Sequence, residues 1–378
     1  MMNTLFIASR LRYKKTIITI SIAISYIVMI VAMAVSSGFR TEVRDALSQM
    51  GGDIQLAPVE LNLLDDVKPM EANPSYLPLL QEVQGVESVN PAIYRAGIVK
   101  VGDNIHGVVV KGEERSDTSA LTVSIPRRLA EIGGLQVGDK MLTYFVGEKV
   151  RARSFKVASI YDPVIETDDK LVVYANIRDM QRLNGWDENQ VSMIEIRMKP
   201  KFRDEYNIEA AAYEVGLIAQ IRATSTPSRY PQLFDWLNLL DFNVLFVLVL
   251  MMIVAGVNMI SGLLITLFEN ISTIGVFKAM GMKNKEISKI FLASSSVAVL
   301  KGMLVGNAIA CLLCVIQDKF HLLKLDPKNY FVSFVPVNLD FMSVFTVDFI
   351  SFVVIILLLM IPCAFISTID PADTVRVN

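Results

Sequence analysis

The sequence predicts an integral membrane protein with four α-helical spans and a large α+β domain inserted outside the cytoplasm after the first span. Hydrophobic residues make up 53% of the 378 residues and charged residues only 20%, with a mean hydropathy of +0.46. This balance is more apolar than that of a typical soluble domain. The apolar residues also gather in stretches long enough to cross a bilayer, which takes about 20 residues. Membrane-spanning and water-exposed segments therefore alternate along the chain.

Four apolar stretches carry the prediction of the spans. The first is uncharged from Thr16 to Phe39, and the second is uncharged from Asn243 to Phe268. The third, from about Ile290 to Ile316, is interrupted once, by Lys301, and the fourth runs from Phe349 to Ile369. The spans are expected at residues 16–39, 242–268, 287–316 and 345–369. Residues 40–241 are too long and too polar for a loop, so we expect them to fold as a separate domain.

Flanking charges predict the orientation. Residues 1–15 contain four basic residues and no acidic one, so this amphipathic segment should stay in the cytoplasm. Residues 40–241 and 317–344 are then periplasmic, whereas 269–286 and the tail 370–378 are cytoplasmic. Three lysines in 317–345 weaken this contrast. A cleaved signal peptide ending near Ala34 is the alternative for the first span, but its uncharged run is longer than a usual signal core.

The external domain is expected to mix strands and helices. Their irregular alternation indicates two subregions. Candidate strands are Asp53–Leu56, Gly97–Val101, His106–Lys111, Lys140–Phe145, Ser154–Ile160, Leu171–Tyr174 and Met193–Met198. Candidate helices are Ser75–Gln84, Pro126–Ile132, Ile177–Leu183 and Glu205–Ile221.

Composition and motifs exclude several functions. Thirty-six basic and 38 acidic residues give a net charge of −2, so no global field attracts nucleic acid. Nucleotide-binding, zinc-protease and serine-hydrolase motifs are missing from the sequence, so no catalytic residue is predicted. Two histidines and three cysteines argue against a metal site, and Cys311 and Cys314 lie in an apolar span where thiols act as small hydrophobes. We expect no cofactor in this chain.

The segment between the second and third spans is amphipathic. Ile271, Ile274, Phe277 and Lys278 recur at helical spacing, and Gly281 is placed to close the turn that follows. The simpler interpretation is a helix lying at the lipid interface. The functional interpretation is a helix that docks on a cytoplasmic motor. Composition alone favours the first.

Sequence motifs favour the second interpretation. The run E-N-I-S-T-I-G-V-F-K-A-M-G resembles the coupling segment E-x-x-x-x-I-G-(I/V)-x-(K/R)-A-x-G of the FtsX-like ABC permeases, also called MacB-type permeases. The one-plus-three span order, S-G-F-R-T-E-V-R-D after the first span and the final I-D-P-A-D-T-V-R are similar to the same family. The runs Y-P-Q-L-F-D-W-L-N-L-L-D-F and V-N-M-I-S-G-L resemble its lipoprotein-releasing LolC/LolE branch.

The resemblance implies a permease subunit in the inner membrane, not an enzyme. A second permease subunit would pair with it, and a separate ABC ATPase dimer would bind ATP and Mg²⁺. Coupled ATP hydrolysis would release lipoproteins toward a periplasmic carrier. The alternatives are a MacB-like exporter of peptides or drugs and an FtsX-like regulator of cell-wall hydrolases. The ATPase-coupling residues implied are Glu269, Ile274, Gly275, Phe277, Lys278, Ala279 and Gly281.

The resemblance also implies that acyl chains enter between the first two spans. Methionine is unbranched and polarizable, which suits an adaptable apolar lining. The candidate cavity residues are Met29, Met33, Phe39, Phe246 and Met251, although ordinary packing explains the methionines equally well. The chain departs from some members of the branch in residues 143–154, which contain no proline-bearing hairpin for carrier capture. Carrier binding would then fall to a partner subunit or use another surface.

Lys301 is the outlier among the apolar residues. A lysine at the centre of a span costs about 2.5–3.5 kcal/mol on insertion scales, so it should face a cavity, a partner or a route to the interface. Snorkelling to the interface is the simpler alternative. Gly302 and Gly306 follow it at the spacing that allows close helix contact.

Overall fold

The computed structural model describes residues 15–58, 68–101, 104–114, 120–145, 147, 150–163, 171–326, 330, 332–364 and 366. The chain divides into two compact units. The membrane unit comprises Met1–Arg40, Trp236–Lys324 and Phe334–Asn378, and the external unit comprises Thr41–Asp235 and Leu325–Ser333. The predicted N-terminal segment 1–15 lies outside the described residues, apart from Lys15, which begins helix α2. The terminal I-D-P-A-D-T-V-R motif also lies outside them.

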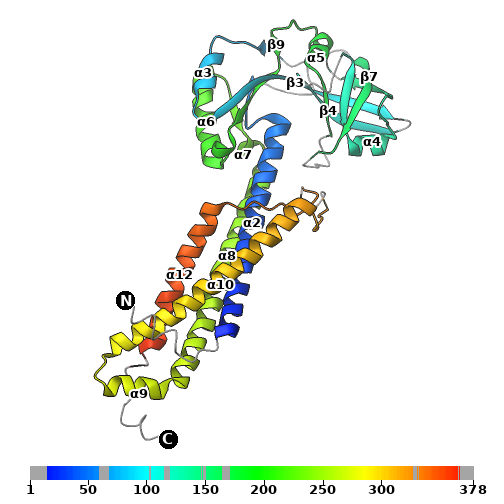
Figure 1. Cartoon of the computed structure of the whole chain (residues 1–378). Coiled ribbons are helices and arrows are strands. Elements are labelled where there is room, and N and C mark those ends of the chain that lie inside the picture. The colour runs from blue at the N-terminus through cyan, green and yellow to red at the C-terminus, as the bar shows by residue number, and fades with distance from the viewer. Residues whose placement is uncertain are drawn as a thin grey trace. The chain divides into compact units, whose positions relative to one another are not determined.

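The membrane unit contains the four predicted spans. Among the described residues, four helices are long and apolar enough to cross a membrane, and the short helix α9 joins two of them (Figure 1). Their bounds are α2, Lys15–Gly51; α8, Pro231–Glu269; α9, Ile271–Ala279; α10, Asn284–Phe320; and α12, Phe341–Ala364. Helices α2, α8 and α10 extend beyond the apolar stretches that predict their spans. The span order one plus three is confirmed.

Close packing of α2 against α10 depends on two glycines. A Cβ on Gly302 would lie 2.7 Å from Ile22 Cβ, and one on Gly306 would lie 2.7 Å from the Ala23 carbonyl oxygen. The small-xxx-small spacing therefore brings two backbones together, as the sequence predicted. The surrounding core includes fully buried residues from all four long helices.

The external unit is built on a nine-stranded sheet in the order β11-β1-β10-β3-β4-β8-β5-β7-β6. Because β6 also pairs with β3, the strands from β3 to β6 in this order close into a barrel. The long strand β3 is shared: its first half pairs with β10 and its second half with β4. The strand bounds are β1, Ile54–Leu56; β2, Met70–Glu71; β3, Val86–Val101; β4, Asn104–Glu113; β5, Thr122–Pro126; β6, Lys140–Phe145; β7, Arg151–Tyr161; β8, Leu171–Asn176; β9, Gln190–Val191; β10, Met193–Met198; and β11, Ala223–Ser225.

Two large hydrophobic cores lie among the described residues of this unit, beside a small cluster of Ala92, Tyr94 and Met193. One lies inside the barrel around Phe145 and Phe155, and the other lies between the open part of the sheet and helices α3 and α6. The expected division into two subregions is thus confirmed (Figure 1). The helix bounds are α3, Leu77–Glu82; α4, Arg127–Gly133; α5, Ile177–Asn184; α6, Glu205–Ala219; and α7, Thr226–Arg229, with a 3₁₀ turn at Pro200–Phe202.

Several predicted boundaries required correction. The strand expected at Gly97–Val101 begins at Val86, because Pro91 and Gly97 interrupt the β-branched pattern without ending the strand. Pro126 ends strand β5 and caps α4, which starts at Arg127 and ends before Gly134, a residue with φ +58°. The prediction assigned Pro126 to the helix and placed no strand before it, so it missed strand β5. The acidic turn expected at residues 168–169 lies outside the described residues.

Candidate functional site

Helix α9 is the element between the second and third spans. Asn270 interrupts the helical path: its side-chain Nδ2 donates to the Thr266 carbonyl oxygen at 2.8 Å. The chain then resumes as α9, where the Ile274 amide donates to the Asn270 carbonyl oxygen at 3.0 Å. Ile274 and Gly275 are buried, and the half-buried Phe277 packs on the membrane core. The amphipathic pattern therefore places one face of α9 against the spans.

Gly281 ends this element. Its φ of +86° is a left-handed conformation that favours glycine. The Gly281 amide donates to the Lys278 carbonyl oxygen at 2.9 Å, and the Met282 amide donates to the Phe277 carbonyl oxygen at 3.0 Å. This turn matches the expectation and redirects the chain into α10.

The opposite side of α9 is exposed. Val276 and Met280, four residues apart, expose 50% and 79% of their surface. Exposed lysines follow at 283 and 285. We call this surface the α9 face; its members are Val276, Ala279, Met280, Lys283 and Lys285. It offers apolar contacts beside positive charge, and the predicted set missed Val276 and Met280, although their i, i+4 spacing marks a second apolar stripe.

The seven predicted coupling residues fall on both sides of this element. Ile274 and Gly275 point inward, and Phe277 and Lys278 are half-buried. Glu269, Ala279 and Gly281 are exposed. The structure thus gathers them at one end of the membrane unit, whereas their role in coupling remains a prediction.

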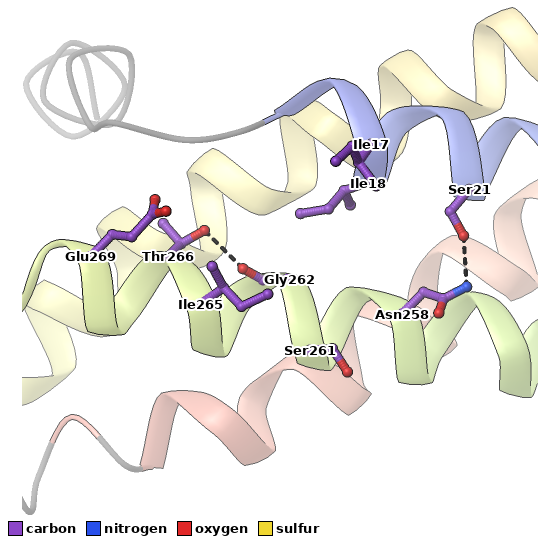
Figure 2. Close-up of a pocket in the computed structure, with 9 residues that line it drawn as sticks. All are labelled: Ile17, Ile18, Ser21, Asn258, Ser261, Gly262, Ile265, Thr266 and Glu269. Atoms are coloured by element: carbon purple, nitrogen blue, oxygen red, sulfur yellow. Dashed lines mark hydrogen bonds between the residues drawn. The ribbon is translucent and has the colours of Figure 1, made fainter.

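A groove of about 280 Å³ lies between α2 and α8 near α9. Figure 2 shows Ile17 and Ile18 on α2, Ile265 on α8, and Glu269 at one end. Asn258 Nδ2 donates to Ser21 Oγ at 2.6 Å and links the two helices across it. The lining residues are Ile17, Ile18, Ser21, Asn258, Ser261, Gly262, Ile265, Thr266 and Glu269. The groove is largely apolar, with a polar link and one carboxylate.

The predicted cavity residues lie elsewhere. Met29 is fully buried in the helix core, and Met33 and Met251 are half-buried. Phe39 is buried and packs edge-to-face on Trp236 at 5.9 Å between ring centroids, while Phe246 exposes 64% of its surface. None of these five residues lines the groove of Figure 2, so their role as lipid contacts stays a prediction.

A polar tie joins α2 to α8 at the other end of these helices. Ser36 Oγ donates to Asp241 Oδ1 at 2.7 Å, and Arg40 forms an ion pair with the same carboxylate. The aromatic contact of Phe39 with Trp236 lies in the same segments. Sequence reasoning missed this tie, because α2 and α8 are separated by the whole external unit.

Lys301 is exposed on α10, among exposed apolar neighbours that include Leu300 and Leu304. Within the part of the chain that the structure describes, it has neither an ion pair nor a hydrogen-bonded side-chain partner. The face of α10 that carries Gly302 and Gly306 contacts α2 instead. The structure therefore places this lysine on a surface open to lipid or to another chain.

In the external unit, the end of α2 is held by cationic and polar side chains. Lys111 Nζ donates to the Met50 carbonyl oxygen at 3.0 Å. Tyr94 Oη lies 3.1 Å from the same oxygen and donates its one proton to Glu195 Oε1 at 2.5 Å. Arg229 donates to the Gly52 carbonyl oxygen at 2.5 Å. Cations at a helix C-terminus satisfy its free carbonyl groups and oppose its dipole. We call this cluster the α2 cap; it consists of Tyr94, Lys111, Glu195 and Arg229.

The α2 cap is buried and charge-balanced. Lys111 is fully buried and lies 3.0 Å from Glu195 Oε2 and 2.8 Å from Glu113 Oε2. Burial opposes its charge, but the two carboxylates outweigh burial and raise the pKa of Lys111. Burial and the adjacent Glu195 carboxylate hold the pKa of Tyr94 well above its ordinary range. Lys111 is therefore a cation and Tyr94 a neutral donor at neutral pH.

A second network fixes Asp53, the second residue after the helix. The carboxylate of Asp53 accepts from Ser48 Oγ at 2.9 Å and from the Met198 amide at 2.7 Å. Arg203 lies 3.3 Å from Asp53 and also pairs with Asp45 of α2 at 2.5 Å. Burial raises the pKa of Asp53, against these hydrogen bonds and the Arg203 charge. The end of α2 is thereby bound to strand β10.

Metal binding finds no support in the described part of the chain. No group of three or more histidine, cysteine, aspartate or glutamate side chains there is placed to hold an ion. The three cysteines are free thiols.

Comparison with known proteins gives an independent view. Residues 245–371 match the family model described as FtsX-like permease C-terminal. The chain is 22% identical to the lipoprotein-releasing system transmembrane protein LolC of Xylella fastidiosa, over 94% of its own length and 92% of the relative. It is 20% identical to LolC of Neisseria meningitidis serogroup B, over 94% and 92% of the two chains.

Two solved structures match part of the chain. The periplasmic region of MacB from Actinobacillus actinomycetemcomitans matches with 11% identity and a TM-score of 0.32, covering 49% of this chain and 94% of that one. The extracellular domain of the ABC-type transporter YknZ from Gram-positive bacteria matches with 10% identity and a TM-score of 0.28, covering 46% and 97%.

Four spans, an inserted external domain and a short helix between the second and third spans fit the class of ABC transporter permeases. Residues 245–371 match the FtsX-like permease domain, and the chain is similar to LolC proteins over 94% of its length. The family prediction is thus confirmed, and no enzymatic family is indicated. Four apolar helices and these relatives fit an inner-membrane protein with a periplasmic domain.

Proposed function

We propose that this chain is the permease subunit of a transporter that releases lipoproteins from the inner membrane toward a periplasmic carrier. The observation that carries the proposal is the similarity to LolC proteins over 94% of this chain, which includes the external unit as well as the spans. A match confined to the FtsX-like domain would support only a permease of unspecified cargo.

The α9 face supplies the contact with the motor in this proposal. Its exposed apolar residues Val276 and Met280 stand beside two lysines, at the turn between two spans. Burying these apolar side chains against a cytoplasmic ATPase would stabilise the complex. The ATPase dimer binds ATP and Mg²⁺, and this chain contributes no nucleotide site.

Transmission to the external unit follows from helix continuity. Residues 15–51 form the single helix α2, and its last carbonyl groups are bonded to strands of the external unit through the α2 cap. Hydrogen bonds join the end of α2 to the external unit. In this proposal, a displacement of the helix end is passed to the sheet through these bonds. A second permease subunit, identical or homologous, would complete the transporter.

Depletion of the protein in its native cells tests the proposed cargo. Membrane fractionation should show acylated lipoproteins accumulating in the inner membrane while other export continues. Re-expression of the wild-type chain should restore their distribution. Unchanged lipoprotein distribution, with depletion verified and no second such permease present, would overturn the proposal and favour export of peptides or regulation of cell-wall hydrolases.

A further inference from the structure

A pair of polar side chains joins two of the spans. Asn307 lies on α10 and Asp348 on α12, and Asn307 Nδ2 donates to Asp348 Oδ2 at 2.6 Å. Both residues belong to helices that can cross a membrane. Ionisable side chains within such helices are rare, and they usually face the protein interior and serve a function.

Two oxygen atoms of this pair are left without donors. Asp348 Oδ1 and Asn307 Oδ1 each expose less than 1 Å² and have no hydrogen-bond partner among the described residues. An ionised carboxylate is an acceptor only, and the amide oxygen is also an acceptor. With Asp348 ionised, the pair would therefore hold a charge and two unsatisfied acceptors in an apolar environment, which is costly.

The neighbouring groups do not neutralise this charge. Ser351 Oγ donates to the backbone oxygen of Asp348 at 3.1 Å and shares a hydrogen bond of 2.6 Å with Tyr26 Oη of α2. Tyr26 is the titratable group that reaches this site from α2, through its bond to Ser351, and an ordinary phenol carries no charge at pH 7. Asp348 forms no ion pair with the basic residues in the described part of the chain. Lys301 lies six residues from Asn307, about 9 Å along α10.

We infer that Asp348 binds a proton in the membrane unit and, as a carboxylic acid, donates a hydrogen bond to Asn307. One proton on Oδ1 turns an unsatisfied acceptor into a donor and gives the Asn307 oxygen its partner. The acid and the amide then form a reciprocal pair that joins α10 to α12 without a charge. If the amide of Asn307 were rotated by half a turn, its oxygen would lie against Asp348 Oδ2. Two oxygen acceptors form a hydrogen bond only when one of them carries a proton, so Asp348 would again be the protonated group.

Asp340 provides a matched comparison eight residues earlier. It precedes α12 and accepts from the Ser343 hydroxyl at 2.6 Å and the Ser343 amide at 3.1 Å. These bonds lower the pKa of Asp340. One aspartate thus caps the helix as an anion, and the other is a neutral donor inside it.

Infrared spectroscopy of the full-length protein in lipid nanodiscs at pH 7 tests the inference. The wild type and Asp340→Asn should show the C=O stretch of a protonated carboxyl group, and Asp348→Asn should lack it. In Asn307→Ala the same band should move to higher frequency, because the acid loses its hydrogen-bond partner. A spectrum of Asp348→Asn that superimposes on that of the wild type overturns the inference.

The Asn307→Ala shift keeps the inference testable if Asp348→Asn does not fold. A band whose frequency is unchanged in Asn307→Ala would also overturn the reciprocal pair. Thermal unfolding of each variant in the same nanodiscs identifies those that remain folded, and only folded variants enter the comparison.

Discussion

Lys111 Nζ donates a hydrogen bond to the carbonyl oxygen of Met50, so a buried cation from strand β4 closes the end of the first membrane helix. The same ammonium group contacts Glu195 and Glu113, which balance its charge. These contacts bind the last turn of α2 to the sheet within the external unit.

Replacing Lys111 by Met should destabilise the external unit strongly. The variant leaves Glu195 buried without its cation and the Met50 carbonyl group with one donor fewer. Breaking a buried ion pair in this way costs about 3–5 kcal/mol. Chemical unfolding of the full chain measures the change, with Lys100→Met, an exposed lysine of β3, as the control. Equal stability of the two variants would contradict the role of the α2 cap.

The contribution of the α2 cap should disappear at high pH. The folded protein raises the pKa of Lys111 above its ordinary value of 10.5 and raises that of Tyr94 as well. Their stabilisation is therefore complete below the unfolded pKa values and is lost as the pH rises through the folded ones. The difference in unfolding free energy between the wild type and Lys111→Met should narrow above about pH 10. A constant difference up to the limit of measurement would argue against this charge pairing.

Aspartate at Val276 or Met280 should separate the permease from its ATPase. The new charge would have to be buried at the α9 face, and each 1.4 kcal/mol of lost binding weakens association about tenfold. Co-purification from membranes measures the loss. Leu217→Asp, at an exposed apolar position of α6, should leave association unchanged. Retention of the ATPase by both α9 variants would exclude this surface as the docking site.

Leucine at Gly306 should force α2 and α10 apart. The added side chain meets the Ala23 backbone, which has no free rotation to relieve the clash. Overpacking of this kind costs about 1–3 kcal/mol. Thermal unfolding in detergent measures the effect, and Ala308→Leu on the exposed side of α10 is the matched control. Similar melting of both variants would refute the close contact.

Phe39→Ala tests the proposed lipid path between the first two spans. The substitution removes the edge-to-face contact with Trp236, so we expect lipoprotein release to fall while the protein stays in the membrane. Inner-membrane retention of lipoproteins is the measurement. The comparison variant is Phe246→Ala, at an exposed member of the predicted set. The two variants together show whether the buried Phe39 and the exposed Phe246 both contribute to lipoprotein release. Normal release by Phe39→Ala would remove it from the path.

Hydropathy was sufficient to predict the four spans, because uncharged stretches of this length are hard to mistake. Motif spacing likewise located α9 and its closing glycine. The α2 cap could not be predicted from local patterns, because Lys111 and Glu195 are 84 residues apart in the sequence. The strand order of the sheet brings them together. Local patterns also hid the full length of β3, because a proline and a glycine within it resemble strand ends.

The larger segment of the external unit, Thr41–Asp235, enters and leaves the sheet through adjacent strands. Strands β1 and β11 pair side by side, with Ile54 opposite Ser225, and Thr226 Oγ1 donates to the Asp53 carbonyl oxygen at 2.7 Å. Arg229, two residues before α8, bonds Gly52, one residue after α2. The segment between Gly52 and Arg229 therefore has its two ends side by side, which is the geometry required of a domain inserted between two helices of one chain.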